Sequence, residues 1–332
     1  MRVSRALFIF FLISTAFLWQ NCIHEYPVAQ GNSGIGEDPE TVSGYIELNY
    51  DLSWQYILHS IDFSTKSGNQ KNHRLIVEVS KDGETVIHDT HYIDDTEFAT
   101  GKFRRKLSIP LEAKRYEIAA WYDRIDDNGT EYFKADKLSD ISIKNHSTTD
   151  TLAFQCAFSA DVLDLTGYAK QREETIVVKE LDMQLPGSRF QIVATDVQDF
   201  ILEQKEALNQ GDKFTTCLDF KSGGNDVFSA YSQRTYSSSD DIRLSGWMRL
   251  PFAEYDELII GQGFVFCEDE GTVAMRVSIK NSALLTVSET AVFTFPIKRG
   301  YITVVKGDFL THPIDGTFKV DHIWSGEIIY EI

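Results

Sequence analysis

The chain has 332 residues, of which 42% are hydrophobic and 12% aromatic. This length exceeds a usual single domain of about 100 to 200 residues and predicts two domains. Its 50 acidic residues outnumber its 32 lysines and arginines, so the formal net charge is -18. Such a surface repels phosphate backbones, which argues against nucleic acid as a partner.

The first 21 residues resemble a lipoprotein signal peptide. Arg2 and Arg5 precede an uncharged run at 6–19. The run is shorter than the roughly 20 residues of a membrane-spanning helix but typical of a signal peptide. It leads into Leu-Trp-Gln-Asn-Cys at 18–22, which resembles a bacterial lipobox. The resemblance implies cleavage before Cys22, acylation of that cysteine, and anchoring of the protein in the outer membrane. The alternative is an ordinary secreted protein in which Cys22 is a plain thiol.

A segment that can bury little follows this cysteine. Residues 22–43 contain Pro27, Pro39 and several glycines, but hardly any apolar side chains. This composition predicts a flexible tether between the acyl chains and a folded body.

Beyond the tether, apolar and polar residues alternate with the period of a half-buried β-strand. The strands predicted in the first half lie around Ile46–Tyr50, Leu75–Val79, Tyr116–Tyr122 and Leu152–Phe158. Asp82-Gly83 predicts a hairpin turn, and Asp-Asp-Asn-Gly at 126–129 predicts another. We therefore expect an N-terminal β-sandwich at 44–160, with one face of each sheet packed and the other exposed to water.

The second half, 161–332, predicts a further β-rich domain. Its clearest predicted strands are 175–183, 190–195, 273–280 and 327–332. Thr195 to Gln198 matches a capping box, apolar residues follow at helical spacing, and Gly211 provides a stop. These signals predict one helix near 196–209. The expected fold is mainly β, with two β-sandwich domains and one helix inserted in the second.

Four segments share residues with one known family. The most specific is Pro-Ile-Lys-Arg-Gly-Tyr-Ile-Thr-Val-Val-Lys-Gly-Asp-Phe-Leu-Thr at 296–311. It is supported by Cys-Ile-His-Glu-Tyr-Pro at 22–27, Ala-Ala-Trp-Tyr-Asp at 119–123 and Tyr-Phe at 132–133. Together they resemble a Bacteroidales family of outer-membrane lipoproteins similar to fimbrial anchor and minor fimbrillin subunits. The resemblance implies two transthyretin-like sandwiches and a partner bound by β-strand addition, in which main-chain hydrogen bonds supply affinity.

The absence of arginine between Cys22 and Arg74 bears on which role is expected. Shaft subunits of the resembled family give up a strand after cleavage at an arginine near the leader. We therefore expect a lipid-anchored cell-surface anchor or accessory subunit, whose partner is a fimbrillin or another surface protein. The alternative is a surface glycan-binding lipoprotein with a sugar-stacking platform. Its candidate residues are Trp54, Trp121, Trp247 and Trp324.

Catalytic and metal-binding signatures are missing from the sequence, so we expect neither an enzyme nor a cofactor. His88 and His91 are three positions apart in a predicted strand, which places them on opposite faces and not around a shared metal. The acidic turn at 123–128 fails the EF-hand pattern, because Arg124 takes its first ligand position and Ala135 its twelfth. A looser oxygen-ligated cation site at this turn is the remaining alternative.

If Cys22 is acylated, three cysteines remain, and three thiols cannot all pair internally. Cys217 and Cys267 both lie in the second half and form the candidate disulfide. Cys156 alternates with apolar residues and is expected in the core. Asp-Thr-Leu at 150–152 resembles a Bacteroidetes O-glycosylation acceptor, with Thr151 as the modified residue.

Overall fold

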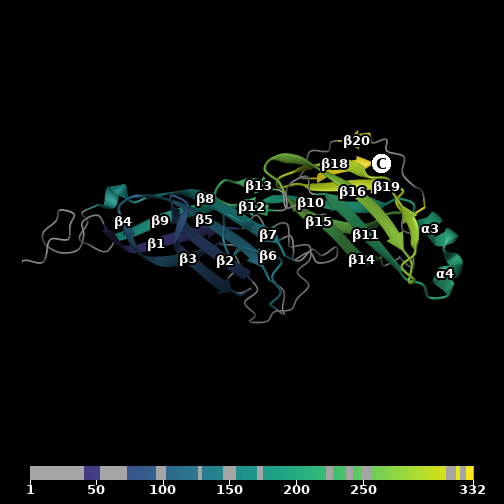
Figure 1. The fold of residues 1–332 in the computed structure, drawn as a ribbon, viewed down its shortest axis with the longest axis horizontal. Coiled ribbons are helices and arrows are strands. Elements are labelled where there is room, and N and C mark those ends of the chain that lie inside the picture. The colour runs from purple at the N-terminus through teal and green to yellow at the C-terminus, as the bar shows by residue number, and fades with distance from the viewer. Residues whose placement is uncertain are drawn as a thin grey trace, which may run out of the picture. The chain divides into compact units, whose positions relative to one another are not determined.

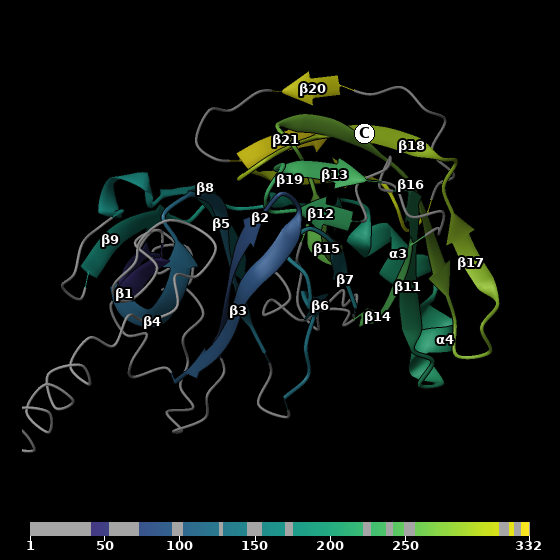
Figure 2. The ribbon, with the colours of Figure 1, turned by 60° about the vertical axis from the view of Figure 1, so that its left-hand side comes forward.

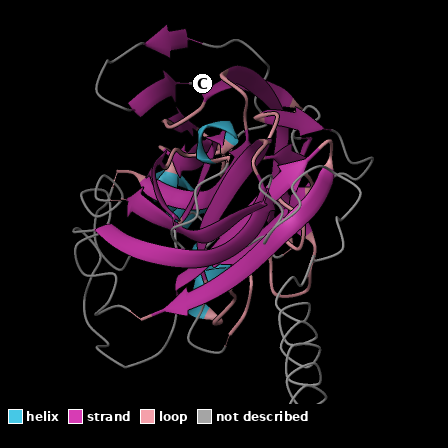
Figure 3. Cartoon of the chain, turned by 90° about the vertical axis from the view of Figure 1, so that its left-hand side faces the viewer, coloured by secondary structure: helices cyan, strands magenta, loops and turns pink. Residues whose placement is uncertain are grey.

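The computed structural model describes residues 41–52, 73–94, 102–125, 129–144, 155–169, 175–221, 227–236, 242–248, 256–311, 319–321 and 327–331. Strands dominate this part of the chain, as Figure 3 shows, and two short α-helices accompany them. No helix in these ranges is long and apolar enough to cross a membrane. The predicted leader and most of the predicted tether lie outside the described ranges, and residues 41–43 of that tether begin a strand.

The described residues before 183 form nine strands. They are β1 (Thr41–Asp51), β2 (His73–Lys81), β3 (Glu84–Ile93), β4 (Lys102–Glu112), β5 (Arg115–Arg124), β6 (Phe133–Lys134), β7 (Ile141–Ile143), β8 (Cys156–Asp164) and β9 (Thr175–Asp182). One sheet has the order β3-β2-β5-β8 and another has the order β4-β1-β9 (Figure 1). A third sheet has the order β13-β12-β7-β6 and so includes strands from both halves of the sequence.

The described residues after 183 form twelve more. They are β10 (Gly187–Ala194), β11 (Phe214–Lys221), β12 (Val227–Ser229), β13 (Arg234–Tyr236), β14 (Ile242–Met248), β15 (Leu258–Phe266), β16 (Glu270–Lys280), β17 (Thr286–Glu289), β18 (Phe293–Lys298), β19 (Ile302–Gly307), β20 (Lys319–Asp321) and β21 (Glu327–Glu331). Two further sheets result, with the orders β15-β10-β19-β21-β20 and β14-β11-β16-β17, and β18 also pairs with β16. The predicted last strand is confirmed as β21, which runs parallel to β19.

The turn at Asp82-Gly83 joins β2 and β3 as the sequence predicts, and Figures 1 and 2 show these strands side by side. Lys81 pairs with Glu84 across the turn. Both turn residues have positive φ, 53° for Asp82 and 82° for Gly83. Asp-Gly tolerates this left-handed backbone, which two-residue hairpins require.

The hairpin predicted at 126–129 is wrong. Strand β5 has β2 and β8 as its neighbours, whereas the next strand, β6, pairs with β7 in a different sheet. Gly129 does take a positive φ of 78°, so the turn signal itself is genuine. A local signal does not reveal which strand the chain meets next. Residues 126–128, the second half of the predicted acidic turn, lie outside the described ranges.

Strands β2 and β5 are buried on both faces. The predicted inward residues of β2, Leu75, Val77 and Val79, are indeed buried. On the opposite face, Ile76 and Trp121 belong to an apolar cluster with Phe133 and Phe266. The expectation of one wet face is therefore wrong for these strands, because residues from β6 and β15 cover it.

The core of the second half is rich in phenylalanine. The ring of Phe190 lies 5.4 Å from that of Phe220 and 5.6 Å from that of Phe295. Strand β16 supplies four inward residues at alternate positions, Val273, Met275, Val277 and Ile279, each 0% exposed. The alternation predicted for this strand is confirmed.

Two helices, α3 (Val197–Glu203) and α4 (Lys205–Asn209), occupy the place predicted for one. The predicted capping box is wrong, because no side chain caps the first turn and the Thr195 hydroxyl donates instead to Asp308 Oδ1 at 2.7 Å. The predicted stop is confirmed, since Gly211 adopts a left-handed φ of 85°.

Asp196 connects the start of α3 to the segment after β19. Its Oδ2 accepts hydrogen bonds from the backbone amides of Leu310 at 2.9 Å and Thr311 at 2.6 Å, and from the Thr311 hydroxyl at 2.8 Å. These residues end the segment 296–311 on which the family resemblance was based. That segment therefore holds the helix against the sheet.

The chain divides into two compact units. The smaller comprises Met1–Ile46, Ser108–Arg115 and Asp164–Val177, and the larger comprises Glu47–Leu107, Tyr116–Leu163 and Val178–Ile332. Within the larger unit, β7 pairs with β12, and the Trp121 ring lies 6.4 Å from that of Phe266. The expected division into sandwiches at 44–160 and 161–332 stays a prediction.

Candidate functional site

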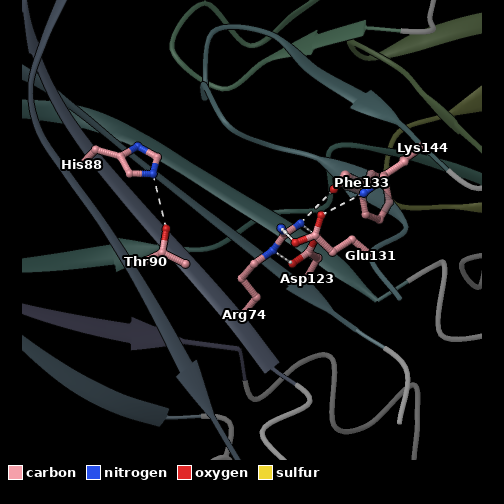
Figure 4. Close-up of polar contacts among 7 residues, drawn as sticks. All are labelled: Arg74, His88, Thr90, Asp123, Glu131, Phe133 and Lys144. Carbon is pink, nitrogen blue, oxygen red and sulfur yellow. Dashed lines mark hydrogen bonds and ion pairs between the residues drawn. The ribbon is translucent and has the colours of Figure 1, made fainter. Parts of the chain in front are cut away.

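The most concentrated polar chemistry in the described chain lies on β2 and its neighbours. Arg74 of β2 stands opposite Asp123 of β5 in the strand register. Arg74 Nε donates to Asp123 Oδ1 at 2.8 Å and its terminal nitrogen donates to Oδ2 at 2.6 Å, with side chains only 5% and 0% exposed (Figure 4). The guanidinium and carboxylate thus form a buried two-point ion pair.

Burial and ion pairing shift the pKa of each of these two residues in opposite directions. Burial alone would lower the pKa of Arg74, but its hydrogen bond to Asp123 and the nearby negative charges raise that pKa further above its ordinary value. Burial raises the pKa of Asp123, and the guanidinium of Arg74 opposes the rise. The arginine therefore stays charged, and the carboxylate depends on it for compensation.

Arg74 also holds the segment that follows β5. It donates to Glu131 Oε1 at 2.8 Å and to the Phe133 carbonyl at 2.9 Å. Lys144 Nζ donates to the other oxygen of Glu131 at 3.3 Å, as Figure 4 shows. One arginine therefore joins β2, β5 and the start of β6.

Glu78 repeats this role four residues along β2. Its side chain is 3% exposed and pairs with His88 Nδ1 of β3 at 2.9 Å. The Leu138 amide donates to its other oxygen at 3.0 Å, and the Tyr231 hydroxyl donates to the same oxygen at 3.4 Å. Burial raises the pKa of Tyr231, so that hydroxyl remains a donor. Glu78 thereby links β3 to residues before β7 and after β12.

These groups are bonded to one another and to backbone atoms, which suits them to holding strands in place. No group of three or more His, Cys, Asp or Glu side chains able to hold a metal occurs among the described residues. Asp123, the first residue of the predicted acidic turn, forms an ion pair with Arg74. His88 pairs with Glu78. His91 lies three residues further along β3 and therefore on the opposite face of the strand, as expected.

A second region of interest is formed by two terminal strands. β8 ends one sheet and β9 ends another. Just after the end of β9, Gln184 forms an isolated antiparallel bridge with Phe158 of β8, and the amides and carbonyls of these two residues bond each other at 2.8 and 2.7 Å. Beyond this bridge, Lys179 Nζ of β9 donates to the Val162 carbonyl of β8 at 3.0 Å. Lys179 also pairs with Asp161.

Arg299 is a structural residue that sequence reasoning did not single out. It lies inside the segment 296–311, in the turn after β18. Its Nε donates to the Cys267 carbonyl at 2.9 Å and its terminal nitrogen donates to the Gln233 carbonyl at 3.2 Å. The guanidinium lies 5.6 Å from the centre of the Phe158 ring. An Arg-Gly pair in a turn was the available signal, but only the fold reveals these partners.

The predicted disulfide is not formed in the structure, where Cys217 and Cys267 are free and buried. Cys217 lies on β11, whereas Cys267 follows β15, and these strands belong to different sheets. Cys156 is buried in the aromatic cluster, as expected. Burial raises the pKa of Cys156 well above its ordinary value and that of Cys267 to about 11.

The other predicted site residues are placed as follows. Cys22, Thr151, Trp54 and Trp324 lie outside the described residues. Trp247 belongs to β14, and its side chain is not described. Trp121 is 0% exposed and packs edge-on against Phe133, so it cannot offer its face to a sugar.

A family described as a family of unknown function (DUF6562) matches residues 39–332. The chain belongs to this family. The match covers both halves of the sequence and all the strands described above. No curated protein matches the chain.

Solved structures offer remote likenesses. The fimbrial anchor protein Mfa2 from Porphyromonas gingivalis is 12% identical, with a TM-score of 0.42 and coverage of 75% of this chain and 81% of that one. A "putative cell adhesion protein" from Bacteroides eggerthii DSM 20697 is 10% identical, with a TM-score of 0.38 and coverage of 90% and 97%.

Proposed function

We propose that this protein is a lipid-anchored cell-surface protein that holds a protein partner by β-strand addition, in the role of a fimbrial anchor or accessory subunit. The lipobox-like sequence at Cys22 supports the anchor. The strand edges of the described chain support the binding mode. The internally bonded polar network supports a structural role for the body.

One observation carries the binding part of the proposal. Strands β3 and β9 are long, and each has one hydrogen-bonded neighbour among the described strands, β2 and β1 respectively. A terminal strand presents main-chain donors and acceptors to which an extended segment of another chain can add. The network at Arg74 and Glu78 holds β2 in place, so an edge built on it is positioned before a partner arrives.

Membrane fractionation tests the anchor. We expect Cys22→Ala to release the protein from membranes, because no acyl chain can then be attached to its thiol. The unaltered protein, extracted in parallel with high salt, should stay with the membrane. If the variant remains as firmly bound as the unaltered protein, the proposed anchor is wrong.

Capture of the partner tests the binding role. The full-length protein is recovered from the cells that produce it in mild detergent, and bound material is identified. An added strand should keep its partner attached through this treatment, since many main-chain hydrogen bonds must break together. Recovery of oligosaccharide with no protein would support the glycan-binding alternative and contradict this proposal.

A further inference from the structure

We propose that the partner binds at the edge formed by residues 159–163 of β8 and 178–182 of β9, here called the β8–β9 edge. We also propose that the partner is an extended protein segment in which apolar and basic residues alternate. This inference rests on the proposed function and deepens it, because it selects one strand edge and defines the chemistry of what adds to it.

The hydrogen bonding along this edge is incomplete in a specific way. Phe158 of β8 bonds backbone to backbone with Gln184, two residues after the end of β9. Four residues further along β8, the Val162 carbonyl receives its hydrogen bond from the Lys179 ammonium at 3.0 Å. A lysine side chain here occupies the position that the amide of an added strand would take. A flexible side chain can leave that carbonyl when a main-chain donor arrives.

Exposed β-branched residues flank this lysine. Val162 is 41% exposed and Val178 is 56% exposed. Ile176, two residues before Val178 and on the same face of β9, is 54% exposed. Alternate apolar side chains on a terminal strand supply the surface against which every second residue of an added strand packs.

The opposite end of the same sheet is protected instead. Strand β4 has the sequence Lys-Phe-Arg-Arg-Lys-Leu-Ser-Ile-Pro-Leu-Glu. Four basic residues and one proline are typical of edges that do not accept another strand. Strand β9 carries one basic residue and no proline. The contrast favours β9 as the accepting edge.

The charges on the β8–β9 edge determine which kind of partner it attracts. Asp161, Glu180 and Asp182 lie on this edge with Lys179 as the only base among these four residues. Asp161 pairs with Lys179, and Glu180 accepts a hydrogen bond from Asn49 at 2.6 Å. This edge therefore carries more acidic than basic groups, and the formal net charge of the whole chain is -18. A basic segment is attracted to this edge, whereas another copy of the same acidic chain is repelled.

Binding of a model peptide tests the assignment. The probe is a short blocked peptide of alternating valine and lysine, and the control peptide has glutamate in place of lysine. Amide hydrogen exchange of the full-length protein should slow at 159–163 and 178–182 with the lysine peptide only. Protection at other strands, or no protection, would overturn the proposal.

A pair of matched variants separates this edge from general attraction to an acidic protein. Val178→Lys should weaken binding of the lysine peptide roughly tenfold or more, through lost packing and added like charge. Val292→Lys makes the same change at an exposed position just before β18, outside the strands, and should leave affinity unchanged. Equal effects of the two variants would overturn the assignment. Both replaced side chains are largely exposed, so both variants should fold, which thermal unfolding checks.

The native partner distinguishes failure of this inference from failure of the proposed function. If the unaltered protein captures a partner and Val178→Lys captures it equally well, the β8–β9 edge is wrong and the proposed function stands. If Val178→Lys loses the partner and Val292→Lys keeps it, the edge is supported. If the unaltered protein captures no protein, both proposals are overturned.

Discussion

A buried arginine stays charged. Arg74 therefore needs the carboxylate of Asp123 beside it as a counter-ion. Sequence patterns could not predict this pair, because 49 positions separate the two residues. The available signals were a single basic residue at the start of an apolar strand and an acid directly after Ala-Ala-Trp-Tyr. Only the register of β2 against β5 shows that the two side chains meet.

Removal of one partner should therefore be costly. Asp123→Ala leaves the guanidinium of Arg74 buried without its counter-ion, and we expect the free energy of unfolding to fall by about 3–5 kcal/mol. Asp51→Ala is the control, because Asp51 pairs with Lys102 where both side chains are at least half exposed. That change should cost at most about 1 kcal/mol. Urea unfolding compares them, and equal losses would contradict the importance of the buried pair.

The thiols make a second prediction at the residue scale. Native Cys22→Ala protein should react slowly with a thiol reagent at pH 8, because Cys156, Cys217 and Cys267 are buried. Unfolded without reductant, it should release three reactive thiols. A count of one would instead establish the disulfide expected from the sequence.

The raised pKa of Cys267 also has a consequence for stability. Its pKa in the folded protein is about 11, above its ordinary value of 9.0, because the buried thiolate is poorly solvated. The unfolded chain therefore loses this proton first as the pH rises. Stability from this group is complete below pH 9.0 and declines between that value and about 11. Unfolding of Cys267→Ser should lack this part of the decline.

At the scale of elements, periodicity predicted the strands better than it predicted their partners. The alternation at 273–280 became β16, and Asp82-Gly83 became the β2–β3 turn. The turn at 126–129 leads into a different sheet, because sheet membership depends on contacts distant in sequence. The helix was predicted in place, but Thr195 and Asp196 bond the 308–311 segment instead of capping it, a choice that only tertiary structure makes.

Close approach of two strands gives a prediction at this scale. A Cβ on Gly187 of β10 would lie 2.1 Å from the Val265 carbonyl oxygen of β15. Gly187→Ala should therefore push these paired strands apart and lower the free energy of unfolding by about 1–3 kcal/mol or more. Gly167→Ala, where a Cβ meets nothing within 4 Å, should be nearly neutral. Comparable stability of the two variants would show that β10 and β15 are not packed this closely.

At the scale of the whole molecule, the sequence predicted a mainly β protein, and its membership of a family of unknown function extends over 39–332. The β8–β9 edge could not be predicted, because it depends on which strands end two sheets and which residues cross between them. In the proposed function, acylation of Cys22 attaches the protein to the membrane, and the β8–β9 edge binds the partner. Function in this proposal comes from holding a second protein in place at the cell surface.

Mass spectrometry of the mature amino terminus, isolated from membranes, tests this proposal most directly. We predict a chain that begins at Cys22 and carries lipid on both its thiol and its amino group. An unmodified Cys22, or a chain that begins at another residue, would contradict the lipid-anchored role.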